Sequence, residues 1–311
     1  MTDLAPAVRT VVRRCLAVQP GENVVVVVDS TLQDVGEALR DEAESAQADA
    51  VLAVMAPRSE NGEEPPPPVA EALAASDVFI APTLKSLSHT QSRKRASERG
   101  ARGATLPGVT ADMLARLLAI DFDVMRARSR AVAELLGAAD TAHVTCPRGT
   151  DLTLDLTGRS GIADDGELTA PGAFGNLPCG EGFIAPLGGE GTVVARSLAS
   201  IGLGESRLTV SGGRLTDATG PEGEQLYERL IAHGEAGTNL AELGVGTNEN
   251  ATLTGNVLED EKILGTVHVA FGASAAIGGT VAVPVHLDVV ITDASLTIGD
   301  TTVLDAGRYV L

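Results

Sequence analysis

The sequence has few aromatic residues, with no tryptophan, two tyrosines and five phenylalanines among its 311 positions. It is also poor in basic residues: 23 lysines and arginines stand against 42 aspartates and glutamates, for a formal net charge of −19. Nucleic-acid binding needs clustered basic side chains for the phosphates and aromatic platforms for unpaired bases. We therefore expect no nucleic-acid partner, and the acidity itself mainly supports solubility.

Cysteines and long apolar runs are equally scarce. The three cysteines, Cys15, Cys146 and Cys179, are odd in number and far apart, which argues against a disulfide framework. No segment reaches the roughly 18–20 apolar residues that span a bilayer, and arginines interrupt the apolar residues of the N-terminus. We expect a cytoplasmic protein with no membrane partner.

Small aliphatic residues and 35 glycines dominate what is present, a composition that suits helices packed closely on sheets. In residues 1–138, apolar strand-length runs alternate with amphipathic stretches. The expected helices are 5–17, 32–46, 69–75 and 111–136, and the expected strands are 23–28, 50–55, 77–81 and 103–106. This alternation predicts βαβ units and an α/β domain with a mostly parallel, Rossmann-like sheet. Because DSTLQD follows the first strand in place of G-x-G-x-x-G, we expect no dinucleotide cofactor.

Residues 139–311 change to short alternating strands, glycine turns and hairpins, interrupted by one clear helix at 222–233. Period-2 alternation with Gly and Asp turns predicts a mostly β (α+β) domain with antiparallel pairing. The boundary is expected near 137–141. The sequence thus predicts a domain of residues 1–138 and a second of residues 139–311.

A histidine and an aspartate two residues apart form the strongest local signal, in the segment PVHLDVV. Residues two apart on a strand point to the same side, so His286 and Asp288 face one way while Leu287 faces the other. An imidazole beside a carboxylate suits Zn, Fe, Mn or Co. The alternative is a hydrogen-bonded pair at the end of a strand.

Three further polar residues stand in apolar, glycine-rich segments: Glu181 in NLPCGEGFIAP, Glu242 in AELGVGTN and His268 in GTVHVAFG. Each has an ordinary explanation, since loop glutamates support solubility and strand histidines are often satisfied core residues. Several such residues in one domain are better explained by convergence on a metal. We therefore predict that residues 139–311 form a metal-binding catalytic domain.

The segments NLPCGEGFIAP, AELGVGTNENA, EKILGTVHVAFG and VHLD, in that order, resemble the aminopeptidase T and S family of metallopeptidases. The resemblance covers most of the C-terminal domain. It implies two metal ions, Zn, Co or Mn, and a homodimer. The implied ligands are Glu181, Glu242, His268, His286 and Asp288. The chain departs from the family in its short length and in AFGASAAIGG, which lacks the family's tyrosine; this departure bears on peptide hydrolysis and leaves the ligands intact.

The segment SLSHT, with the residues RKRASERGARGATLPGVTADML that follow, resembles the first domain of ring-opening dioxygenases acting on dihydroxypyridine. This resemblance implies one Fe(II) on His268, His286 and Asp288, with His89 as a base near the substrate. The alternative for His89 is a loop histidine beside a helix cap. That branch carries a histidine where this sequence keeps Glu242, so Glu242 favours the two-metal arrangement.

From these features we predict a metal-dependent hydrolase of the aminopeptidase type, acting on a small amine- or amide-bearing substrate or a short peptide through a metal-activated water. Glu181 would take the proton of that water, and His89 would contact the substrate from the other domain. The alternatives are a non-heme Fe(II) ring-cleaving dioxygenase and a metal-binding protein that has lost peptidase activity. Metal stoichiometry distinguishes the three.

Overall fold

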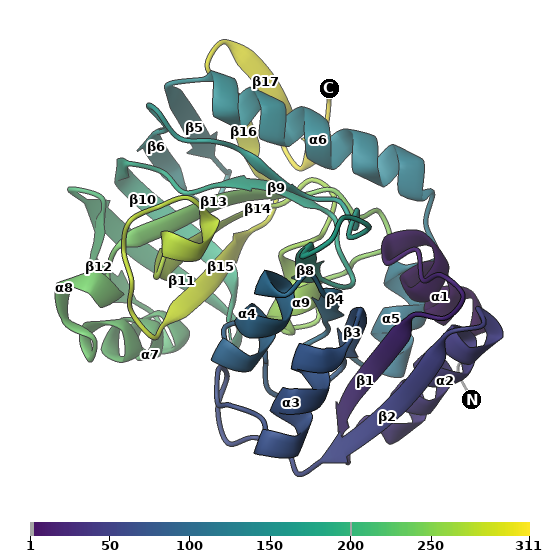
Figure 1. Ribbon diagram of the computed structural model, residues 1–311. Coiled ribbons are helices and arrows are strands. Elements are labelled where there is room, and N and C mark those ends of the chain that lie inside the picture. Colours follow the sequence, from purple (N-terminus) through teal and green to yellow (C-terminus); the bar gives the residue numbers. More distant parts are fainter. Residues whose placement is uncertain (1–2, 200) are drawn as a thin grey trace. The chain divides into compact units, whose positions relative to one another are not determined.

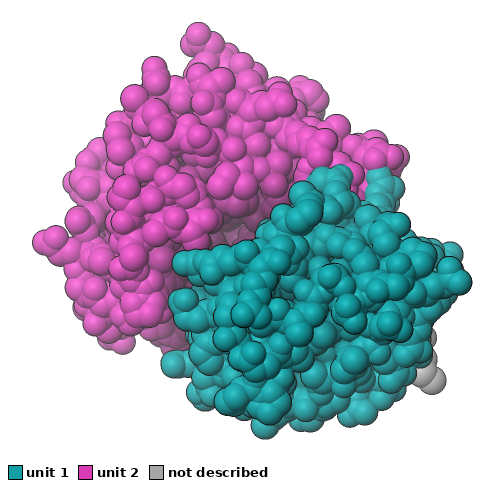
Figure 2. All heavy atoms as spheres, viewed as in Figure 1, with its two compact units in different colours: residues 1–120, 166–179 teal, residues 121–165, 180–311 magenta. Residues whose placement is uncertain are grey.

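The computed structural model describes residues 3–199 and 201–311. The chain divides into two compact units, coloured separately in Figure 2. Unit 1 comprises residues 1–120 and 166–179, and unit 2 comprises residues 121–165 and 180–311.

This division differs from the predicted boundary between residues 138 and 139 in two segments. Helix α6 (Phe122–Ala138) belongs to unit 2, and residues 166–179 return to unit 1. The returning segment contains a strand that pairs with the sheet of unit 1. The chain therefore passes between the units three times.

In the described part of unit 1, five parallel strands form a sheet of order β2-β1-β3-β4-β8 (Figure 1). Their bounds are β1 (Asn23–Asp29), β2 (Asp49–Met55), β3 (Val78–Ala81), β4 (Arg102–Thr105) and β8 (Phe174–Asn176). In β1 every residue after the first is buried, as expected for a valine-rich central strand covered on both faces. The predicted mostly parallel α/β sheet is confirmed.

Helices cover both faces of this sheet. They are α1 (Ala5–Arg9), continued by the π-helical η1 (Thr10–Cys15), then α2 (Gln33–Ser45), α3 (Pro67–Ala75), α4 (Gln91–Glu98) and α5 (Ala111–Leu117). Gly36 of α2 lies so close to Val28 that a Cβ there would come within 2.4 Å of that side chain. Leu73 of α3 and Ala96 of α4 share a core cluster with Val27. Because Val27 and Val28 are adjacent on a strand, they face opposite sides of the sheet.

One helix prediction is wrong, and one helix lies outside the predicted ranges. The single helix expected at 111–136 is broken between α5 and α6, because Asp121 caps the start of α6: its carboxylate accepts from the backbone N–H groups of Asp123 and Val124. Helix α4 was not predicted, since QSRKRASE has almost no apolar stripe; Thr90 caps it by accepting from the N–H of Arg93. No helix in the described residues is long and apolar enough to cross a bilayer.

Unit 2 is built on a large antiparallel sheet, which confirms the predicted mostly β second part. In the described chain its thirteen strands run in the order β18-β17-β16-β5-β6-β10-β15-β14-β13-β9-β7, with β11 and β12 continuing from β10. The bounds are β5 (Thr141–Thr145), β6 (Asp151–Asp155), β7 (Ile162–Asp164), β9 (Glu181–Ile184), β10 (Gly188–Leu198), β11 (Gly202–Ser211), β12 (Arg214–Thr219), β13 (Leu240–Gly246), β14 (Val267–Gly272), β15 (His286–Ile291), β16 (Ser295–Ile298), β17 (Thr301–Asp305) and β18 (Arg308–Tyr309).

Unit 2 also contains α6, α7 (Pro221–Ile231), α8 (Gly234–Gly237), α9 (Val257–Asp260) and the 3-10 turn η2 (Ala275–Ile277). Of these, α6, α7, α8 and α9 contact the second sheet. Helix α6 lies along β9 (Figure 1) and places Val132 and Leu136 in the core of unit 2 with Leu243 and Val245 of β13. Leu243 and Val245 therefore hold one face of β13 against the core, which leaves the opposite face of the strand for polar side chains.

Candidate metal centre

Four neighbouring strands carry all five predicted ligands. In the sheet order β15-β14-β13-β9, His286 and Asp288 belong to β15, His268 to β14, Glu242 to β13 and Glu181 to the start of β9. The sequence places these residues far apart, and the strand pairing brings them together.

The register aligns these side chains on one face of the sheet. Ala270 of β14 pairs with Glu242 on one side and with Asp288 on the other. Directly paired residues of antiparallel strands point to the same face. The small Ala270 therefore separates two carboxylates in one cross-strand row, and His268 lies two residues away on the same face.

Gly244 provides the room for one of the histidines. It pairs directly with His268, and a Cβ at position 244 would lie 2.0 Å from Nε2 of that ring. No side chain other than hydrogen fits there without moving the imidazole. The contact with His268 therefore explains why the segment AELGVGTN has glycine at position 244.

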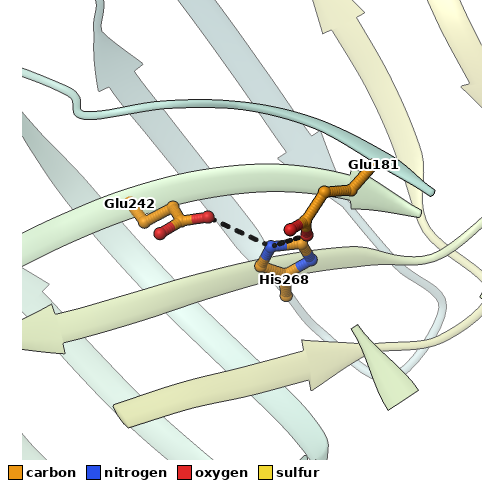
Figure 3. A group of neighbouring side chains, drawn as sticks. All are labelled: Glu181, Glu242 and His268. Atoms are coloured by element: carbon orange, nitrogen blue, oxygen red, sulfur yellow. Dashed lines mark hydrogen bonds and ion pairs between the residues drawn. The ribbon is translucent and has the colours of Figure 1, made fainter. Parts of the chain in front are cut away.

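The histidines and carboxylates are in contact through their side-chain atoms. Nε2 of His268 lies 3.1 Å from Oε2 of Glu181 and 3.4 Å from Oε1 of Glu242 (Figure 3). Nε2 of His286 lies 3.3 Å from Oε2 of Glu242 and 3.4 Å from Oδ1 of Asp288. The two oxygens of Glu242 therefore face different histidines.

The described side chains form two groups that can hold a metal ion, and both include Glu242. One is Glu181, Glu242 and His268, and the other is Glu242, His286 and Asp288; within each, the ligand atoms lie within 4.8 Å of one another. The side chain of His268 is 1% exposed, whereas those of His286 and Asp288 are 27% and 13% exposed. The second group is the one that a small molecule reaches more easily.

The electrostatics of the cluster favour bound cations. Burial lowers the pKa of His268, but Glu181 and Glu242 raise it well above its ordinary value. Burial also lowers the pKa of His286, and Asp288 and Glu242 raise it in the same way. Although burial raises the pKa of Glu242, hydrogen bonds from the two histidines lower it to about 2. Protons on the two imidazoles thus balance the carboxylates, and a divalent ion would displace them.

The residues present fit a divalent metal. Oε2 of Glu181 is buried and lies 3.1 Å from Nε2 of His268, so both atoms are available to one ion. Nδ1 of His286 donates to the carbonyl oxygen of Ala273 at 2.7 Å, which turns Nε2 toward the carboxylates in the manner of a metal-bound histidine. Imidazole and carboxylate donors together suit Fe, Zn, Mn or Co.

A buried lysine that no sequence pattern indicates lies beside the centre. Nζ of Lys262 lies 2.5 Å from Oε1 of Glu181, 2.7 Å from Oε1 of Glu261 and 3.4 Å from Oδ2 of Asp164. Burial raises the pKa of Asp164 to about 7 and that of Glu261 to about 8, despite the opposing charge of Lys262. For Glu181, burial raises the pKa but Lys262 and His268 bring it below its ordinary value. A charge run such as DEK normally indicates a solvated surface, so nothing in its spacing marks these residues as buried.

His89, the predicted substrate contact, belongs to unit 1. It lies between β3 and α4, next to the capping residue Thr90, and its side chain is exposed. His89 is thus a loop histidine beside a helix cap, as in the alternative considered for it from the sequence. Its contact with a substrate stays a prediction.

Comparisons with known proteins agree with this fold. The family model of NicX, 2,5-dihydroxypyridine 5,6-dioxygenase, matches residues 3–311. The solved structure of 2,5-dihydroxypyridine dioxygenase from Pseudomonas putida KT2440 matches with a TM-score of 0.84 and 19% identity, covering 99% of this chain and 96% of that chain. Wild-type AmpT from Thermus thermophilus matches with a TM-score of 0.73 and 19% identity, covering 99% of both chains. At such identities the two structures show a shared fold. No curated protein sequence matches.

Proposed function

Because the chain belongs to the 2,5-dihydroxypyridine 5,6-dioxygenase family, we propose that it is a metal-dependent dioxygenase that opens a dihydroxylated nitrogen heterocycle. The observation that carries this proposal is the match of the family over residues 3–311. The sequence favoured the hydrolase and gave the ring-cleaving dioxygenase as an alternative. The family match reverses this order. In such a reaction both atoms of O₂ enter the ring-opened product, so no external reductant is needed.

We assign a single Fe(II) to Glu242, His286 and Asp288, the more exposed of the two groups. Bound there, Fe(II) would supply the redox chemistry for O₂. The resemblance to the dioxygenases implies iron on His268, His286 and Asp288, whereas the ligand atoms of His268 group with those of Glu181 and Glu242 within 4.8 Å. The proposed set has one histidine and two carboxylates, in contrast to the two histidines and one carboxylate that the resemblance implies.

The protein's own residues have three tasks in this proposal. The carbonyl of Ala273 orients His286, and Glu242 remains ionised at neutral pH because its pKa is about 2. His89 is the proposed base for a substrate hydroxyl, an assignment that rests on the resemblance of its segment.

The proposal is tested by anaerobic reconstitution with Fe(II), followed by oxygen-electrode assays with 2,5-dihydroxypyridine and its positional isomers. We expect about one iron per chain and O₂ uptake equal to the substrate consumed, without added reductant. A fully iron-loaded protein that consumes no O₂ with any dihydroxylated pyridine contradicts the proposal.

The two-metal hydrolase remains the second candidate because of one specific observation. Glu242 turns one oxygen to each histidine, the position of a carboxylate that bridges two metal ions. Two Zn, Co or Mn ions per chain, with hydrolysis of amino-acid amides or short peptides, would favour it. A chain that binds no metal would favour a protein that has lost its activity.

A further inference from the structure

Lys262 is one of only three lysines in the sequence, and its side chain is 1% exposed. It lies between α9 and β14, and its backbone is fixed from both sides. Its N–H donates to the carbonyl of Glu259, and its carbonyl accepts from the N–H of Asn248, each at 2.9 Å. An ammonium group is rarely buried without ionised partners, because desolvation of the charge is costly.

Lys262 and His268 contact different oxygens of the Glu181 carboxylate. Nζ lies 2.5 Å from Oε1, while Oε2 lies 3.1 Å from Nε2 of His268. A metal ion between Glu181 and His268 would therefore have only Oε2 available from this glutamate. It would also lie next to the ammonium group on the other oxygen of the same carboxylate.

A second ion beside Glu181 would meet the charge of Lys262. The ammonium group contacts Oε1 of Glu181 and also the carboxylates of Glu261 and Asp164, at 2.7 and 3.4 Å. A divalent ion between Glu181 and His268 would lie close to this ammonium group in a buried region, where like charges repel strongly.

We propose that Lys262 keeps the centre mononuclear by holding Oε1 of Glu181 and placing a fixed positive charge beside the Glu181–His268 position. The inference rests on the proposed metal centre and deepens it.

The test is metal binding by Lys262→Met, with Lys262→Arg as the charge-conserving variant. Lys94→Met is the matched control, because Lys94 is exposed on α4 and pairs only loosely with Glu98, at 3.9 Å. Each purified full-length protein is titrated with Co(II), followed by visible absorption and elemental analysis. We expect one Co(II) per chain in wild type, Lys262→Arg and Lys94→Met. In Lys262→Met we expect a second ion, bound at least tenfold more tightly than any second ion in wild type.

A double variant covers the case in which Lys262→Met does not fold. Asp164→Asn with Lys262→Met removes one charge of each sign from the same cluster and leaves Glu181 for metal. Circular dichroism shows whether each variant is folded. A folded double variant that still binds one ion overturns the proposal, as does a wild type that binds two ions with similar affinity.

The same titration separates this inference from the proposed function. A wild type that binds no Co(II) contradicts the metal centre and the inference together. One bound metal in wild type and two in Lys262→Met, without ring opening, would support the role of Lys262 while contradicting the dioxygenase.

Discussion

The two oxygens of Glu242 face different histidines, and this makes it the residue at which one-metal and two-metal centres differ most. In a one-metal centre Glu242→Gln removes an anionic ligand, so we expect at least tenfold weaker binding of the single ion. In a two-metal centre the same change would lower occupancy from two ions to about one. Elemental analysis after reconstitution distinguishes these results.

The complementary change at this position is Glu242→His. This change introduces the histidine that the dioxygenase branch carries where this sequence keeps Glu242. We expect this variant to keep one iron per chain. Loss of all metal from a folded Glu242→His protein would contradict the assignment of this residue to the iron.

His286 and Asp288 are the residues whose removal most directly tests the site. Both lie at the start of β15 and are partly exposed, so truncation leaves the core of unit 2 intact. We expect His286→Ala and Asp288→Ala each to abolish bound metal with little loss of folded protein. His143→Ala is the control, because His143 is half-exposed and pairs with Asp151 away from the ligands. Wild-type metal content in either site variant would refute the assignment.

At the scale of elements, the pairing of β13 with β14 allows the site because position 244 has no side chain. Gly244→Ala would place a Cβ 2.0 Å from Nε2 of His268. We expect at least tenfold weaker metal binding and a stability loss of about 1–3 kcal/mol, the usual cost of overpacking. Gly188→Ala is the control, since a Cβ there meets its nearest atom at 3.7 Å. Equal metal binding in the two variants would contradict this account.

An ion pair ties β4 to the turn before β1 and makes unit 1 sensitive to acid. Arg102 donates to both oxygens of Glu22, at 2.8 and 2.7 Å, and also to the carbonyl of Leu16. Burial raises the pKa of Glu22, but Arg102 and the N–H of Gln19 bring it below its ordinary value. A depressed carboxyl pKa stabilises the fold above the unfolded pKa, and this contribution disappears as pH falls through the folded pKa.

We therefore expect the free energy of unfolding to decline less between about pH 5 and pH 3 in Glu22→Gln than in wild type. At pH 7 the variant should be less stable by about 1–3 kcal/mol, the cost of breaking a charge-assisted pair. Urea unfolding at several pH values measures both. Parallel pH profiles of the two proteins would show that Glu22 does not contribute.

The sequence predicts a helix or strand correctly where a single local pattern identifies it. Valine-rich runs identified β1 and β2, and the alternation in PVHLDVV put His286 and Asp288 on one face. Other features depend on partners distant in the chain. Strand β8 has three residues and joins the sheet only by pairing with β4, and Lys262 is buried only because Glu181 and Asp164 are brought to it. The cap at Asp121 was a local signal, but the apolar period on both sides of it suggested one helix.

For the whole molecule, the homodimer remains a prediction based on resemblance. The edge strand β2 exposes Val51 and Val54 at 57% and 47%, so unit 1 carries apolar surface at a sheet edge. Light scattering at micromolar concentration should give twice the 31.7 kDa of the chain. A mass equal to one chain would refute it.

The three passages of the chain between the units have a consequence for how the protein can be divided. A cut at residue 138 would leave the first fragment without β8 and its sheet with an unpaired edge at β4. The second fragment would carry β8, a strand of the unit 1 sheet, whose last residue Asn176 precedes Glu181 by five positions. Neither fragment therefore contains one complete unit: the first keeps α6 of unit 2, and the second keeps residues 166–179 of unit 1.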